Sequence, residues 1–173
     1  MIVVLPFSPD HAAGVVSVIL PIQQQEFGVP ITLDAQPDLA DIPGFYQTGA
    51  GNFWVAVDGQ TVVGTIALLD IGNRQAALRK MFVAAAYRGS KHGVAGLLLD
   101  ELLAWASTKG VAEVFLGTTD KFLAAHRFYQ KNGFGDVPKT SLPEAFPVMA
   151  VDSKFYRRVL HRGGAVPPCA SSS

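Results

Sequence analysis

The hydrophobic period of the chain changes between residues 83 and 94, and this change limits the fold more than any other feature. Before it, three aromatic and β-branched runs are separated by turn-forming dipeptides, a pattern that predicts an antiparallel meander. The runs are 53–57, 61–69 and 77–83, and the turns are Asp58-Gly59 and Gly72-Asn73. After it, apolar residues recur every three or four positions up to Gly110, as in an amphipathic helix, and a strand is expected at 111–116. The order strand, helix, strand implies a parallel crossover.

The segments on either side of this unit predict the remaining elements. Strands are expected at 2–5, 134–138 and 147–156, and helices at 11–25, about 38–47 and 120–132. Pro21 is expected to kink the first helix or to split it in two, because proline removes a helical N–H group. Together these elements predict a mixed α/β (α+β) fold in one domain over residues 1–161. The serine-rich end, 162–173, is expected to be a flexible tail.

Composition and charge exclude several classes of protein. Of the 173 residues, 49% are apolar and 16% are charged. The chain therefore has enough apolar side chains to form the hydrophobic core of one domain. Lysine and arginine number 14, as do aspartate and glutamate, and this balance disfavours nucleic acid as a partner. No apolar run reaches the roughly 20 residues that cross a bilayer, and the start of the chain lacks a secretory pattern. We therefore expect no membrane partner and a cytoplasmic location.

Histidine and cysteine usage argues against a metal. The four histidines, at 11, 92, 126 and 161, include no pair spaced for a shared zinc ion, and Cys169 is the single cysteine. A lone cysteine also forms no internal disulfide. We expect no metal cofactor.

A glycine-rich loop precedes the strongest predicted helix, over residues 87–95. The free N–H groups and positive dipole end of a helix N-terminus, with nearby basic side chains, suit a pyrophosphate. The same glycines also fit a loop that is merely a tight turn. Both nucleotide-binding fingerprints, the Walker type and the dinucleotide type, are missing.

Several motifs in register resemble the acyl-CoA-binding core of the GNAT superfamily of N-acetyltransferases, most strongly over 78–134. They are Leu78-Arg79-Lys80-Met81-Phe82-Val83, the Tyr87-Arg88-Gly89 loop, the Leu97–Trp105 helix, Leu116-Gly117-Thr118-Thr119, and the run from Ala124 to Phe134. The resemblance implies a mixed, mostly antiparallel seven-stranded sheet with flanking helices. The sheet would be splayed between its fourth and fifth strands, which are parallel, with the pantetheine arm of acetyl-CoA in the splay.

The resemblance also implies which residues hold acetyl-CoA, the expected co-substrate. They are Met81, Phe82, Val83, Arg88, Gly89, Ser90, Lys91, His92, Gly93, Val94, Ala95 and Tyr129. The loop departs from the family pattern, since Ser90 stands where the family has Arg or Gln and the loop is longer by about two residues. Backbone amides are still expected to cradle the pyrophosphate, with Arg88, Lys91 or His92 as alternatives for the side-chain contact.

Two residues of the 120–132 helix are candidates for catalysis. Tyr129 matches the family's tyrosine, whose hydroxyl protonates the departing CoA sulfur, although an aromatic on an amphipathic helix also suits core packing. His126 precedes it by one helical turn and is a candidate proton relay. A packing or solvated histidine is the more frequent alternative. The general base is left open between water and Glu26.

The acceptor side is less constrained. Glu26 and Phe27 end the first helix, where the family places a substrate-facing loop, and they are the candidates for binding the acceptor. A small-molecule amine or a protein amino group would serve as acceptor, and pairing as a homodimer is common in the family. A ping-pong route needs a nucleophile that holds the acetyl group, and the single thiol, Cys169, lies in the expected tail, so direct attack by the amine in a ternary complex is expected. The alternative is a non-catalytic domain that binds or senses acyl-CoA.

Overall fold

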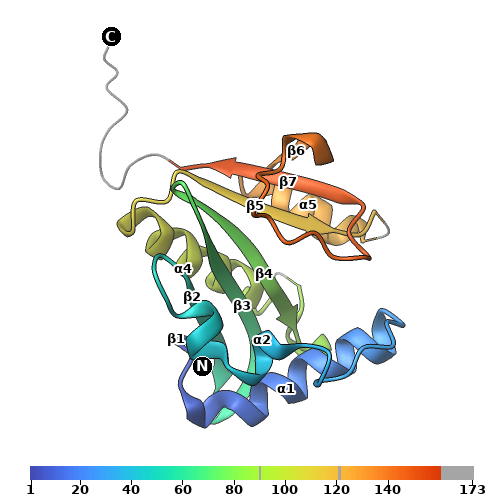
Figure 1. The fold of residues 1–173 in the computed structure, drawn as a ribbon. Coiled ribbons are helices and arrows are strands. Elements are labelled where there is room, and N and C mark those ends of the chain that lie inside the picture. Colours follow the sequence, from blue (N-terminus) through green and yellow to red (C-terminus); the bar gives the residue numbers. More distant parts are fainter. Residues whose placement is uncertain (90, 121, 161–173) are drawn as a thin grey trace.

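The computed structural model describes residues 1–89, 91–120 and 122–160, which form a seven-stranded sheet covered by helices on both faces (Figure 1). The strand order is β1-β2-β3-β4-β5-β7-β6, and the β4–β5 pair alone is parallel within these residues. The predicted fold class is therefore confirmed. The strands are β1 (Ile2–Pro6), β2 (Asn52–Asp58), β3 (Thr61–Gly72), β4 (Gln75–Val83), β5 (Glu113–Thr118), β6 (Gly135–Val137) and β7 (Lys154–Val159). The expected tail, 162–173, lies outside the described residues.

The longer helices agree with the sequence pattern, and the shorter ones show where proline and polar residues interrupt it. Pro21 ends the regular part of the first helix, which continues as a wider π-helical turn, η2. The helix expected at 38–47 is broken at Asp41, whose carboxylate accepts a hydrogen bond from the Gly44 N–H at 3.0 Å. The elements are α1 (Ala12–Pro21), η2 (Ile22–Glu26), α2 (Pro37–Ala40), α3 (Ile42–Tyr46), α4 (Val94–Thr108) and α5 (Leu123–Lys131), with 3₁₀ turns η1 (Pro9–His11), η3 (Ala85–Tyr87) and η4 (Lys139–Ser141).

The alternation of side chains along β2 divides the core into two layers. Trp54 and Ala56 face α4 and α5, whereas Phe53 and Val55 face α1 and the short helices. Every one of these side chains is buried. Because successive residues of a strand point to opposite faces, a strand with helices on both sides is apolar throughout. The unbroken apolar character of 53–57 thus reflects a central strand.

The parallel pair β4–β5 separates soon after it begins, and this confirms the predicted splay. The ladder between these strands covers three residue pairs and ends at Ala77 and Phe115, although both strands continue. Further along β4, the backbone of Lys80 is left-handed, with φ 54°, and the register with β3 shifts between Thr65 and Ala67. The Thr65 hydroxyl donates to the Lys80 carbonyl oxygen at 2.7 Å. A bulge of this kind bends a strand, so β4 turns away from β5.

The last predicted strand is wrong at its beginning. A strand was expected over 147–156, but β7 begins at Lys154, which pairs with Thr118 at the end of β5. Residues before it have no strand opposite them, because β5 ends there. Instead, the Met149 N–H donates to the Asp152 carboxylate at 2.9 Å, and the Asp152 N–H donates to the Met149 carbonyl at 3.0 Å. These bonds close a turn, so the segment before β7 is a loop.

The helix that follows β5 also begins later than expected. The helix predicted from residue 120 starts at Leu123 as α5. The Asp120 N–H donates to the Ser153 hydroxyl at 2.9 Å. Asp120 is thus tied to the loop before β7 and does not cap the helix.

Candidate active site

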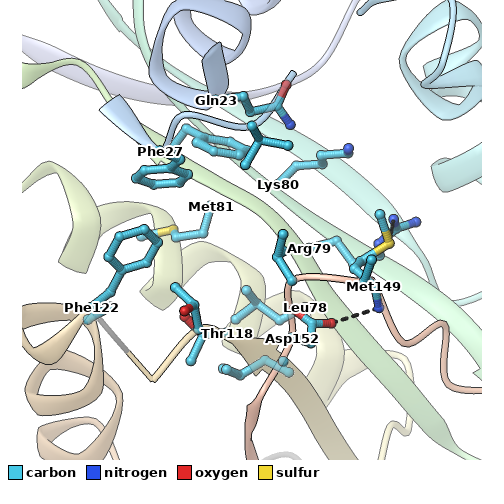
Figure 2. A pocket seen from close by; sticks show the side chains of 18 of the residues that line it. Gln23, Phe27, Leu78, Arg79, Lys80, Met81, Thr118, Phe122, Met149 and Asp152 are labelled. Carbon is cyan, nitrogen blue, oxygen red and sulfur yellow. Dashed lines mark hydrogen bonds between the residues drawn. The ribbon is translucent and has the colours of Figure 1, made fainter. Parts of the chain in front are cut away.

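A cavity of about 340 Å³ lies where β4 and β5 separate (Figure 2). Its walls come from η2 and the loop after it, from β4, from the end of β5, from α5, and from the loop before β7. Most of the lining side chains are apolar, and the charged ones are Arg79, Lys80 and Asp152. The lining residues are Gln23, Phe27, Val29, Ile31, Leu78, Arg79, Lys80, Met81, Phe82, Leu116, Gly117, Thr118, Thr119, Phe122, Ala125, Tyr129, Phe146, Pro147, Met149, Ala150, Val151 and Asp152.

Tyr129 lines this cavity from α5. Its side chain is buried, and its ring packs against Phe128, Phe134 and Tyr156. Among the described residues, its hydroxyl has no hydrogen-bond partner. Burial raises the pKa of this hydroxyl well above its ordinary value, so the proton stays in place at neutral pH. A buried hydroxyl without a partner is unusual in a folded protein, and here it offers a proton donor to whatever occupies the cavity.

His126 is buried rather than solvated, and the described part of the chain gives it other partners. Its Nε2 lies 2.8 Å from the Thr119 carbonyl oxygen, and its ring centroid is 6.0 Å from that of Tyr156. It is absent from the residues that line the cavity. These contacts favour the packing alternative for His126, and its role as a relay stays a prediction.

The cofactor residues expected from the sequence fall into two groups. Met81, Phe82 and Tyr129 line the cavity, whereas Val83 and the described part of the loop 88–95 lie outside its lining. Ser90 is not among the described residues.

The loop before α4 contains two glycines in left-handed backbone conformations. Gly89 and Gly93 have φ angles of 93° and 64°, in the region that favours glycine, and no atom lies within 4 Å of a Cβ placed at either position. Helix α4 begins at Val94, and among the described residues no side chain caps its N-terminus. The first N–H groups of α4 are therefore not taken by a capping side chain.

Glu26 and Arg88, expected to serve different ligands, bind each other. The Arg88 guanidinium donates to both Glu26 carboxylate oxygens, at 2.7 and 2.9 Å, and its Nε donates to the Val83 carbonyl at 2.8 Å. The hydrogen bond from Arg88 lowers the pKa of Glu26, which makes this carboxylate a weaker base. Of the two predicted acceptor residues, only Phe27 lines the cavity.

Asp152 is a cavity residue that the sequence did not single out. Its carboxylate packs over Gly117, where a Cβ would lie 2.6 Å from Oδ2. Burial raises the pKa of Asp152, opposed by the hydrogen bond from the Met149 N–H and by the charge of Arg79. A carboxylate of raised pKa in a cavity is a candidate base. The sequence could have indicated Asp152 as an acidic residue in a loop. It was missed because a strand was predicted over 147–156.

A buried polar cluster lies beside the cavity, where η2 and α2 approach β4. The Lys80 ammonium lies 3.3 Å from the Asp38 carboxylate and donates to Gln36 Oε1 at 2.8 Å. Tyr46 donates to the same Asp38 carboxylate at 2.6 Å, and the amides of Gln23 and Gln36 bind each other. Burial lowers the pKa of Lys80, although Asp38 counteracts it. The cluster ties η2 and α2 to β4, so the loop between them is held against the sheet.

The sheet opens between two parallel strands, a glycine-rich loop precedes the crossover helix, and a tyrosine lies in the opening. This is the architecture expected from the resemblance of the sequence motifs to the GNAT acetyltransferases. The comparison with known families agrees. The chain belongs to the acetyltransferase (GNAT) family, whose sequence profile matches residues 18–134.

Individual relatives extend this result. The chain is 36% identical over 104 residues to N-acetyltransferase family 8 member 2 of Rattus norvegicus, a match that covers 57% of this chain and 45% of that protein. It thus spans less than half the length of this curated relative. Among solved structures, an acetyltransferase of the GNAT family from Staphylococcus aureus Mu50 has a TM-score of 0.87 and 36% identity, covering 93% of this chain and 100% of that one.

A more distant structure supports the fold alone. N-acetylglutamate synthase from Neisseria gonorrhoeae, solved with coenzyme A and N-acetyl-glutamate, has a TM-score of 0.69 and 16% identity; the match covers 94% of this chain and 36% of that one.

The described residues contain neither a membrane-spanning helix nor a group of metal-binding side chains. No helix among them is both long and apolar enough to span a bilayer. Within the same residues, no three side chains of histidine, cysteine, aspartate or glutamate come together as metal ligands would.

Proposed function

We propose that this protein transfers an acetyl group from acetyl-CoA to a primary amine by direct attack in a ternary complex. The observation that carries the proposal is the buried, protonated hydroxyl of Tyr129, which lines the cavity between β4 and β5 without a partner among the described residues. The N-acetyltransferase names of the relatives support the same activity.

The residues present suit acetyl-CoA. The uncapped start of α4 and the open space around Gly89 and Gly93 suit a pyrophosphate. Beyond Ala77, the edge of β4 that faces β5 has no ladder partner, so its backbone groups are open to the amides of a pantetheine arm. The Arg88 guanidinium is paired with Glu26, which favours Lys91 or His92 for the side-chain contact with the pyrophosphate.

Two side chains handle the protons of the reaction. When bound, acetyl-CoA supplies an acetyl group activated as a thioester. Asp152 accepts the proton that the attacking amine loses, and the Tyr129 hydroxyl donates its proton to the sulfur that leaves. One C–S bond is exchanged for one C–N bond, and proton exchange with solvent restores both side chains.

The experiment that tests the proposal combines binding with turnover. Titration calorimetry with coenzyme A is expected to give one site with a Kd in the micromolar range, about 1–100 μM. Incubation with acetyl-CoA and a panel of primary amines is expected to release free thiol with at least one acceptor. Absence of heat from coenzyme A would contradict the proposal. Heat without thiol release on any amine would instead favour the alternative, a domain that binds acyl-CoA without catalysis.

The ternary mechanism makes a separate prediction about Cys169, which lies outside the described residues. A double-displacement route needs a side chain that holds the acetyl group, and this chain has one thiol. Cys169→Ala is therefore expected to retain full kcat, within about 2-fold. Initial rates with both substrates varied are expected to give intersecting double-reciprocal lines. Parallel lines would show that the acetyl group is held on the protein between two half-reactions.

A further inference from the structure

Two charged side chains of the cavity, Arg79 and Asp152, form no ion pair in the described part of the chain. Lys80 has a carboxylate partner in Asp38. Arg79, in contrast, has no carboxylate within 4.0 Å in the described part of the chain. Its guanidinium donates to the Met149 sulfur at 3.4 Å and lies 6.0 Å from the centre of the Phe45 ring. A thioether is a weak acceptor, so this cation is held in contacts that a ligand carboxylate would outcompete.

The unpaired arginine and the candidate base lie at the same end of the cavity. Figure 2 shows Arg79, Met149 and Asp152 near one another and away from Phe27 and Phe122. Arg79 and Asp152 form no direct ion pair among the described contacts. A positive and a negative group that face one cavity without touching match a ligand that carries both charges.

We propose that the acceptor is an amino acid, a primary amine that also carries a carboxylate, with Arg79 binding the carboxylate and Asp152 the ammonium. The inference rests on the proposed function and names the substrate class of the same site. Arginine is the side chain best suited to a carboxylate, because its planar donors bind both oxygens at once. Asp152 then takes one proton from the ammonium and passes it to solvent before the neutral amine attacks, and the same carboxylate accepts the second proton as the C–N bond forms.

The charge arrangement disfavours other amines. A polyamine brings a second cation toward Arg79, where like charges repel. A lysine side chain of a protein has no free carboxylate at a fixed distance from its amine. Most of the remaining lining of the cavity, including Ile31, Phe146 and Val151, is apolar, which suits an acceptor with an uncharged side chain.

The test compares each amino acid with its own primary amide. With the wild-type protein, kcat/KM for the best amino acid is expected to exceed that for its amide by about 10- to 50-fold, the size of a charged hydrogen-bond contact. Arg79→Gln is expected to reduce this ratio to below about 3-fold by slowing the amino acid while the amide is little affected. Arg79→Lys, which keeps the charge, is expected to restore part of the ratio. Arg127→Gln, the same change on the exposed face of α5, is the matched control and leaves the ratio unchanged.

A binding measurement without turnover accompanies the kinetics. Calorimetry in the presence of coenzyme A is expected to show weaker binding of the N-acetylated product to Arg79→Gln than to the wild type, by a similar factor. Circular dichroism of the variants checks that they fold.

The outcomes separate this inference from the proposed function. Preference for amides or polyamines, or a carboxylate preference that survives Arg79→Gln, overturns the assignment of Arg79 and leaves the acetyltransferase activity standing. Thiol release with amines but with no amino acid overturns it as well. Failure to bind coenzyme A overturns the proposed function, and the inference fails with it.

Discussion

Replacing Tyr129 by phenylalanine is expected to lower kcat by about 100- to 1,000-fold, the usual contribution of a general acid. The departing thiolate then leaves without a proton donor beside it. Because the lost hydroxyl has no partner among the described residues, the variant is expected to fold as stably as the wild type. Single-turnover measurements assign the loss to the chemical step rather than to product release.

Tyr156 provides a matched control for Tyr129. It is buried beside Tyr129, with ring centroids 6.1 Å apart, but its hydroxyl accepts a hydrogen bond from Gln130 at 3.3 Å and it does not line the cavity. Tyr156→Phe is expected to keep kcat within about 3-fold, because it removes the same atom without removing the proton donor. If Tyr129→Phe also keeps its kcat, the assignment of Tyr129 as the acid is wrong.

The pH dependence gives a second check on Tyr129. The reaction needs the protonated hydroxyl, and burial raises the pKa above its ordinary value near 10. The active form therefore persists to higher pH than an exposed tyrosine would allow. The kcat profile of the wild type is expected to show no fall from this group below about pH 10.

Replacing Asp152 by asparagine is expected to lower kcat/KM for the amine by about 100-fold near neutral pH. The amide keeps an oxygen that can accept the hydrogen bond from the Met149 N–H, so the turn before β7 is retained, but it takes no proton. Burial raises the pKa of Asp152 in the folded protein, so its ionisation costs folding free energy above that pKa. The uncharged variant is therefore expected to be at least as stable at neutral pH.

The pH profile distinguishes a base from a structural carboxylate. In the wild type, kcat/KM is expected to fall on the acid side as Asp152 takes up a proton, with an apparent pKa above that of an ordinary aspartate because burial raises it. In Asp152→Asn this limb is expected to disappear, and the rate instead rises with the fraction of free amine. Asp100→Asn, an exposed change on α4, is the control and keeps the wild-type profile. An Asp152→Asn variant that retains the acid limb would show that another group is the base.

The sequence was sufficient wherever neighbours along the chain decide the outcome. The aromatic and β-branched run at 53–57 predicted a strand, and the three- and four-residue spacing after Gly93 predicted a helix, since both signals depend on residues close together in the chain. The loop before α4 was likewise recognisable from its glycines and its place between a strand and a helix. The position of Tyr129 followed from a motif contained within one helix.

The sequence was insufficient wherever the partner is distant. Lys80 and Asp38 are brought together by the packing of α2 on β4, and no local sequence pattern predicts this ion pair. Glu26 was predicted to bind the acceptor amine, but the fold pairs its carboxylate with Arg88. The segment 147–153 was predicted to be part of a strand, but the pairing of β5 with β7 ends at Thr118, so this segment has no strand to pair with.

The sequence by itself therefore determined the order of the elements, the fold and the family resemblance, because hydrophobic periodicity and turn residues act over a few positions. Only the tertiary structure decided which charges face the cavity. The bulge at Lys80 opens the sheet, and the turn closed by Asp152 places a carboxylate opposite Arg79, since burial and pairing depend on residues that lie far apart along the chain.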